Sequence, residues 1–183
     1  MSQVDPIEVI DRQGEVCLVV DSEEILDVLR HSTSHLMALA VMELFPDVHL
    51  GIGPSTSEGF YYDFQTPHRF VEEDLEKIEA KMEELKRQKL AFQPSIFSKE
   101  EAVAFFREKD ESLKVELIED RADQTLSSYR LGPFVDFCTG PHVSSTDQLG
   151  VFKLLSIAGS YWRGDEKREQ LQRIYGTAFA SQE

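Results

Sequence analysis

The sequence has only two cysteines, Cys17 and Cys138, and no apolar run that approaches the roughly 20 residues needed to span a membrane. Its first residues contain neither the basic stretch nor the apolar stretch of a secretory signal, which argues against secretion. We therefore expect a cytoplasmic protein with no membrane partner. Both cysteines should then be free thiols, and Cys17, which has no ligand motif around it, is expected to be a small core residue.

Positive charge is also scarce, because 19 lysines and arginines face 34 aspartates and glutamates, giving a formal net charge of −15. Such a chain repels nucleic acid unless its cations are concentrated locally. The stretch SYWRGD, residues 160–165, places aromatic rings beside a cation. This composition suits stacking on unpaired bases, but it also suits a packed aromatic corner. Both interpretations stay open for the candidate tRNA-contacting group Trp162, Arg163, Lys167, Arg168 and Arg173.

The chain does contain enough apolar material for one sizeable core, since 41% of its 183 residues are hydrophobic. Hydrophobic periodicity and turn residues predict an α+β domain in which an antiparallel or mixed sheet is layered with helices. Residues 113–120 are compatible with a strand or a short helix. The predicted helices are 22–45, 72–90 and 98–106, and the predicted strands are two within 7–20, a hairpin over 48–64, and runs at 92–97, 129–138, 151–157 and 171–179.

Two short motifs carry most of the chemical information. His31 and His35 are four residues apart, and therefore lie on one face of the predicted helix. Cys138 and His142 flank a Gly-Pro turn that can bring the thiol and the imidazole together. If both pairs converge, three imidazoles and one thiolate form a plausible tetrahedral zinc set. The same groups also suit metal-free hydrolysis, in which an imidazole handles a water proton and neighbouring donors stabilise an oxyanion.

Three further side chains are relevant to such a site. Asp136 lies two residues before Cys138 on a predicted strand, so both side chains should project to the same side, where a carboxylate could orient a histidine or hold a substrate amine. Tyr62 should face the opposite side of its strand from Tyr61. Lys114 lies between apolar residues, where a solvated lysine is the commoner outcome and a cation at the edge of the core is the alternative.

Four sequence blocks together resemble the N-terminal editing domain of threonyl-tRNA synthetase. They are RHSTSHLMALAV, LGIGPSTSEGFYYDF, FVDFCTGPHV and AGSYWRGDEKREQLQRIYGTAF, and they follow the order and spacing of that family. The paired His/His and Cys/His motifs also occur in alanyl-tRNA synthetase editing domains, whereas the GFYYDF and YWRGD blocks favour the threonyl type. On this resemblance, residues 22–183 are the editing domain, and residues 1–21 are a residual linker or an edge hairpin.

The resemblance implies a hydrolase that removes serine from mischarged tRNA(Thr). It implies that His31 and Lys114 hold the attacking water, that Asp136 contacts the seryl amine or hydroxyl, and that Cys138 and His142 form the pocket wall. His35 and Tyr62 are the implied substrate-binding residues. No cofactor is expected to be required. Zinc is possible, and its ligands would be His31, His35, Cys138 and His142.

The resemblance also limits what the chain is expected to do. Threonyl-tRNA synthetases use ATP and threonine in a catalytic core that this sequence does not contain, so we expect no aminoacylation. The expected partners are the acceptor end of tRNA(Thr) carrying serine and the remainder of a synthetase chain. Two alternatives stay open: a freestanding editing factor acting in trans, and a non-catalytic zinc-binding or tRNA-docking module.

Overall fold

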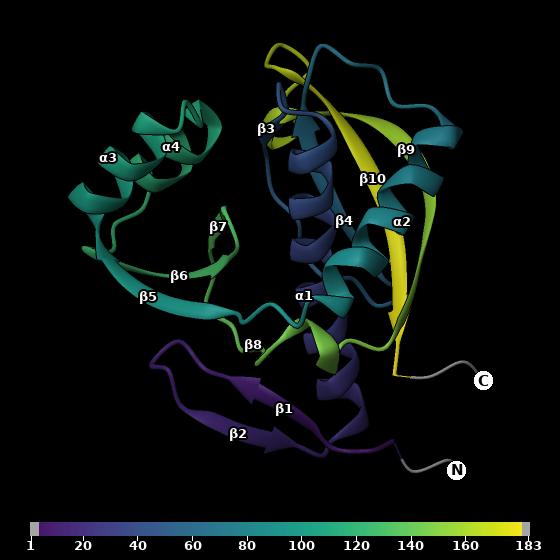
Figure 1. The fold of residues 1–183 in the computed structure, drawn as a ribbon. Coiled ribbons are helices and arrows are strands. Elements are labelled where there is room, and N and C mark those ends of the chain that lie inside the picture. The colour runs from purple at the N-terminus through teal and green to yellow at the C-terminus, as the bar shows by residue number, and fades with distance from the viewer. Residues whose placement is uncertain (1–3, 181–183) are drawn as a thin grey trace.

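The computed structural model describes residues 4–180 and has the predicted α+β architecture (Figure 1). Every pairing between its strands is antiparallel, and the strands form three sheets around the long helix α1 (Ser22–Leu44). Asp21 begins this helix, because its carboxylate accepts hydrogen bonds from the backbone N–H groups of Glu23 and Glu24. Nearly all residues in the centre of α1 are buried, so this helix forms the middle of the core.

The largest sheet has four strands in the order β3-β4-β10-β9. Helix α1 and helix α2 (Glu72–Arg87) cover one of its faces, and α2 presents apolar residues at helical spacing to the core. Alternate residues of β4 point into this core, among them Phe60, Tyr62 and Phe64. The four strands are β3 (His49–Leu50), β4 (Phe60–Gln65), β9 (Val151–Tyr161) and β10 (Gln170–Phe179).

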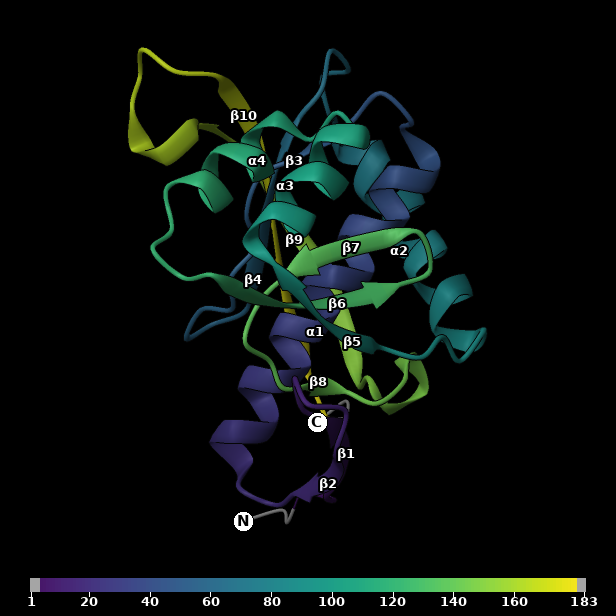
Figure 2. The same cartoon turned by 90° about the vertical axis from the view of Figure 1, so that its left-hand side faces the viewer.

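The second sheet consists of β5 (Gln93–Ser98), β6 (Thr125–Leu131) and β7 (Phe134–Phe137); β6 and β7 carry buried side chains on both faces, whereas edge strand β5 is largely exposed. Side chains on one face, such as Tyr129, join the main core beside α1. Side chains on the other face, such as Val135, pack against helices α3 (Lys99–Glu108) and α4 (Ser112–Glu119). Figure 2 shows these two helices from that side. Successive residues of β7 therefore point alternately toward α1 and toward α3 and α4.

The third sheet is formed by β2 (Val16–Val19), β1 (Ile7–Ile10) and β8 (His142–Val143). The two short strands predicted within residues 7–20 are thus present. Val9 of β1 pairs with Val143 of β8, and Val9 is buried in the main core together with Val19. The hairpin is therefore continuous with the rest of the fold. Because β8 begins at His142, the hairpin also supports one of the candidate site residues.

Three expectations from the sequence are corrected or resolved by the structure. The run 129–138 is not one strand, because Gly132 has a φ of +57° and, with Pro133, turns the chain between β6 and β7. Residues 113–120 are helical, since they lie mostly in α4. Cys17 is not a core residue, because it lies on edge strand β2 and is exposed. Single turns of 3-10 helix occur at Thr146–Gln148 and Trp162–Gly164.

Within residues 4–180, no helix is both long enough and apolar enough to cross a bilayer.

Candidate functional site

The first part of the site lies in the buried middle of α1, where the rings of His31 and His35, one turn apart, meet edge to face. Their ring centroids are 4.9 Å apart. The polar residues between them are satisfied by the backbone, because the Thr33 hydroxyl donates to Leu29 and the Ser34 hydroxyl donates to the carbonyls of His31 and Gly53. These bonds allow a polar turn to be buried, and the second bond from Ser34 ties the loop before β4 to the helix.

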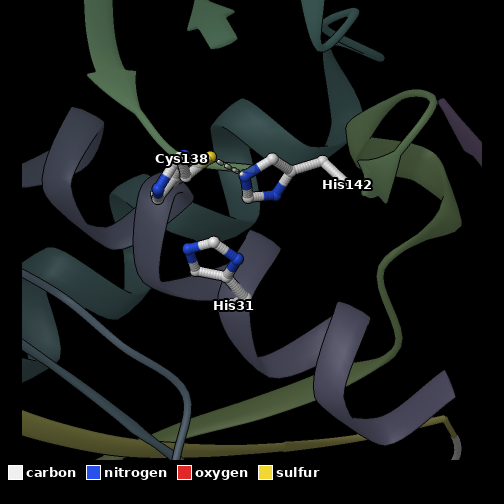
Figure 3. A group of neighbouring side chains, drawn as sticks. His31, Cys138 and His142 are labelled. Carbon is white, nitrogen blue, oxygen red and sulfur yellow. Dashed lines mark hydrogen bonds between the residues drawn. The ribbon is translucent and has the colours of Figure 1, made fainter. Parts of the chain in front are cut away.

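The second part comes from the segment between β7 and β8. Cys138 follows β7 and His142 begins β8, and the Cys138 Sγ lies 3.1 Å from the His142 Nε2. Figure 3 shows this contact and the His31 ring facing the same space. The other nitrogen of His142, Nδ1, lies 2.8 Å from the Ser32 Oγ, which also accepts the Val143 N–H. Ser32 therefore fixes the orientation of the His142 ring from α1.

These two parts converge. His31, His35, Cys138 and His142 each offer one donor atom, and the four atoms lie within 4.8 Å of one another. The His142 ring centroid is 4.5 Å from that of His31 and 4.4 Å from that of His35. The predicted meeting of the two motifs is therefore present in the structure.

Burial sets the charge state of this cluster. It lowers the pKa of His35 and His142 well below the ordinary value, and it also lowers the pKa of His31. The same desolvation raises the pKa of the Cys138 thiol. Near neutral pH the cluster is thus three neutral imidazoles and a neutral thiol. Neutral imidazole is the form that accepts a proton or binds a metal.

The donor set fits a metal ion. Imidazole nitrogen and cysteine thiolate are typical zinc ligands, so the Cys138 thiol would release its proton on binding the ion, and a tetrahedral site needs donor separations of about 3.5 Å. The present separations require only a modest inward shift of the side chains. The Nδ1 atom of His35 is buried and has no hydrogen-bond partner within residues 4–180. An unsatisfied buried nitrogen is costly, and ligation of this histidine or a bound substrate would reduce that cost.

A second polar cluster, centred on Asp136, adjoins the first. The Lys114 Nζ lies 2.6 Å from Asp136 Oδ1, and the Tyr62 hydroxyl donates to Oδ2 over 2.7 Å. The Nε2 of His35 lies 3.9 Å from Oδ2 and links the two clusters. Burial and the neighbouring Asp136 carboxylate raise the pKa of Tyr62 well above its ordinary value, which keeps the tyrosine protonated as a donor.

Lys114 differs from the sequence expectation of a solvated lysine, because only 1% of its surface is exposed. It lies on the face of α4 that packs toward β7, and the Asp136 carboxylate compensates its buried charge. The centroids of the Tyr62 and Phe137 rings lie 5.5 and 5.2 Å from its ammonium nitrogen, within the range of cation–π attraction. The predicted projection of Asp136 toward the side of Cys138 is consistent with this placement.

Several residues that support the site were not identified from the sequence. Ser32 and Ser34 lie between the two histidines of the first motif, and this position in the sequence indicates that they are close to the site. The sequence around Gly53 contains no comparable indication. A Cβ atom at this position would approach the Tyr62 ring to 1.9 Å, so only glycine lets this loop pack on the tyrosine. Glu111, one turn before Lys114, is buried and accepts the Leu50 N–H, and burial raises its pKa.

Comparison with known proteins gives the site a family context. Residues 126–175 match the threonyl and alanyl tRNA synthetase second additional domain. A threonine–tRNA ligase from Marinobacter nauticus is 49% identical over 180 residues, which is 97% of this chain and 28% of the ligase. One from Carboxydothermus hydrogenoformans is 51% identical over 178 residues, which is 96% of this chain and 28% of that ligase. The resemblance to a threonyl-tRNA synthetase segment is confirmed. The chain spans about 28% of the length of these two relatives.

In this relative of threonine–tRNA ligases, Trp162, the aromatic residue of the candidate tRNA-contacting group, is buried. Trp162 is 1% exposed, packs with Leu113 and Leu171, and donates its indole N–H to Glu116. The packed-corner interpretation therefore describes this tryptophan. Arg168 forms two hydrogen bonds to the same Glu116 carboxylate.

The other cations of this group are also largely engaged within the protein. Arg163 pairs with Asp120, and Arg173 forms a two-point ion pair with Asp63. Lys167 is exposed. Their contact with tRNA stays a prediction from the sequence. Three of these four positive charges are neutralised by neighbouring carboxylates, so they contribute little attraction for a polyanion.

Proposed function

We propose that this chain hydrolyses the ester bond of serine mischarged onto tRNA(Thr), as the editing segment of a threonyl-tRNA synthetase. The observation that carries the proposal is the convergence of the two clusters: three imidazoles and a thiol adjoin a buried Asp136 that is held by Lys114 and Tyr62. The similarity to segments of threonine–tRNA ligases supports the same assignment. The remainder of a synthetase chain and tRNA(Thr) are the proposed partners.

Proofreading of serine follows from the size of the two amino acids. Serine lacks one methyl group of threonine, and a pocket built for threonine rejects serine by only about 1–3 kcal/mol. A second site that hydrolyses the smaller ester supplies the missing discrimination. The buried polar cluster around Asp136 offers a carboxylate to the ammonium and hydroxyl groups of serine, and in this proposal the same pocket excludes threonine by a steric clash with its added methyl group.

The proposed reaction needs a proton acceptor and a site for the developing charge. His31 is the half-buried member of the histidine cluster, and its lowered pKa leaves it neutral and able to accept a proton from water. The water oxygen then attacks the ester carbonyl, the bond to the ribose oxygen breaks, and the proton passes to that oxygen. The Lys114 ammonium is paired with Asp136. From this position it would help to orient the seryl group and would offset the negative charge that develops on the ester oxygen.

The test is hydrolysis of seryl-tRNA(Thr) by the chain, with threonyl-tRNA(Thr) as the competing ester. We expect serine release well above the uncatalysed rate and little threonine release. Lys114→Met and Asp136→Asn should reduce the rate by about 10²–10⁴-fold. Lys153→Met is the matched control, because Lys153 is an exposed lysine that pairs with Glu79 far from the cluster. Hydrolysis that is unchanged in both site variants would contradict the proposal.

A metal-binding module is the second candidate, and the mutual proximity of the four donor atoms favours it. His31, His35, Cys138 and His142 would hold the ion. With all four side chains as ligands the tetrahedral site would be closed and structural, whereas a site with three of them as ligands would keep an open position and would supply a Lewis acid to the ester carbonyl. Metal analysis of chain purified without chelator separates the possibilities: one equivalent of zinc together with no seryl-tRNA hydrolysis would favour a non-catalytic zinc module, whereas hydrolysis that persists after chelation would favour the metal-free reaction.

A further inference from the structure

A groove opens beside the candidate site and shares Cys138 with it. Its volume is about 460 Å³, within the range of about 300–1,000 Å³ that is typical of small-ligand sites. One wall carries Arg12, from the turn between β1 and β2, and another carries Arg121, from the loop between α4 and β6. Cys138 and Thr139 line the same groove, which therefore adjoins the histidine cluster.

The two arginines differ from the cations near Trp162. Within residues 4–180, no carboxylate lies within 4.0 Å of the Arg12 guanidinium. Arg121 has a single exposed partner, Asp123, at 3.3 Å, and its guanidinium carbon lies 5.8 Å from the centroid of the Phe137 ring. In a chain with a net charge of −15, the groove thus gathers exposed positive charge next to the site.

We propose that this groove binds the phosphodiester backbone of a single-stranded RNA 3′ end, so that the terminal esterified nucleotide reaches the cluster at Cys138. The proposal rests on the proposed function, because it assigns the path by which that substrate enters. Guanidinium groups bind phosphate oxygens through paired hydrogen bonds, and an arginine plane can also stack on an unpaired base. Exposed Ile96 on the same groove offers an apolar contact to a base.

The groove also contains a carboxylate, and its removal should affect RNA binding in the opposite direction to removal of an arginine. Asp123 lies in the same groove and pairs with Arg121. Its charge opposes a phosphate and competes for the guanidinium. Removal of this carboxylate should strengthen RNA binding, whereas removal of either arginine should weaken it.

The experiment measures binding of a fluorescein-labelled RNA hairpin with an unpaired, unacylated 3′ end, by anisotropy over a range of salt concentrations. Arg12→Gln and Arg121→Gln should each weaken binding by about threefold to tenfold and reduce the slope of log K against log salt by about 0.7. Asp123→Asn should tighten it, and Arg12→Lys should keep the salt slope. Arg107→Gln is the matched control, because it removes an exposed arginine on α3 that pairs with Glu119.

The outcomes separate this proposal from the proposed function. Affinities and salt slopes that are the same in the groove variants, the control variant and the unchanged chain would overturn the groove, even if the chain hydrolyses seryl-tRNA. The absence of any RNA binding would overturn it as well. Binding that depends on Arg12 and Arg121 without ester hydrolysis would leave the groove in place and contradict the proposed function.

Discussion

At the scale of single residues, the site depends on how buried polar groups satisfy one another. Asp136 accepts hydrogen bonds from Lys114, Tyr62 and the Phe137 N–H, so its buried charge is balanced by one cation and two further donors. The position of Asp136 relative to Cys138 could be predicted from strand alternation. The burial of Lys114 could not, because it depends on a carboxylate 22 residues away that only the fold brings to it.

Gly53 gives a prediction at this scale. In Gly53→Ala the new methyl group would meet the Tyr62 ring at 1.9 Å, so the loop or the ring must move and the hydrogen bond from Tyr62 to Asp136 weakens. We expect a loss of about 1–3 kcal/mol in the free energy of unfolding and a slower seryl-tRNA hydrolysis. Denaturant unfolding and the deacylation assay measure the two effects.

Gly159→Ala provides the control for this prediction. An added Cβ at Gly159, in strand β9, meets no atom within 4 Å, and the residue does not have a positive φ. Its stability and activity should therefore stay close to those of the unchanged chain. Equal effects of the two substitutions would show that the contact with Tyr62 is not what requires glycine at position 53.

At the scale of elements, helix α4 shows where sequence patterns are insufficient. Residues 113–120 alternate in a way that suits a strand and also repeat at helical spacing, so local periodicity could not decide between them. In the structure α4 packs Leu113 against Trp162 and packs Val115 and Ile118 against α3 and the second sheet. Contacts on two of its sides therefore select the helix. The longer helices α1 and α2 were predictable for different reasons: α1 begins after the capping residue Asp21 and ends before Pro46, and α2 has apolar residues at helical spacing.

Glu116, on helix α4, gives a prediction about how the stability of the protein depends on pH. Hydrogen bonds from Arg168 and Trp162 lower the pKa of Glu116 from 4.5 to about 2. Because the folded-state pKa is depressed, this carboxylate contributes its full stability above about pH 4.5 and loses it as the pH falls toward 2. Glu116→Gln should cost about 1–2 kcal/mol at pH 7, a value reduced for partial exposure to solvent, and should cost progressively less between pH 4.5 and 2.

The measurement is urea unfolding across that pH range, comparing Glu116→Gln with Glu119→Gln. Glu119 is on the same helix but is more exposed, and among the described residues its carboxylate pairs with the exposed Arg107 alone, so its replacement should change stability by less than about 0.5 kcal/mol. A cost of Glu116→Gln that stays constant from pH 7 to pH 2 would contradict the assignment of the acid-sensitive interaction to this carboxylate.

At the scale of the whole molecule, pairing between strands that are far apart in the sequence determines contacts that local sequence patterns do not predict. The hairpin within residues 7–20 was predicted as two strands, yet nothing local indicates that β1 pairs with β8, more than 130 residues later. The same pairing holds β8 next to α1, where Ser32 contacts both His142 and Val143. The convergence of the two histidine motifs could be proposed from their chemistry, but the hairpin that supports it could not.

This arrangement predicts that the segment from residue 4 to residue 21 is part of the folding unit and not a dispensable linker. Val9 is 1% exposed, pairs with Val143 and belongs to the main core, whereas Leu18 on the same hairpin is 66% exposed. Val9→Ala should therefore reduce the free energy of unfolding by about 1–3 kcal/mol, and Leu18→Ala should change it by less than about 0.5 kcal/mol.

A chain starting at residue 22 should lose more stability than Val9→Ala and should hydrolyse seryl-tRNA more slowly, because β8 and His142 lose their neighbouring strand. Urea unfolding and the deacylation assay test this order, and a chain of residues 22–183 as stable and active as the full chain would instead support the linker interpretation.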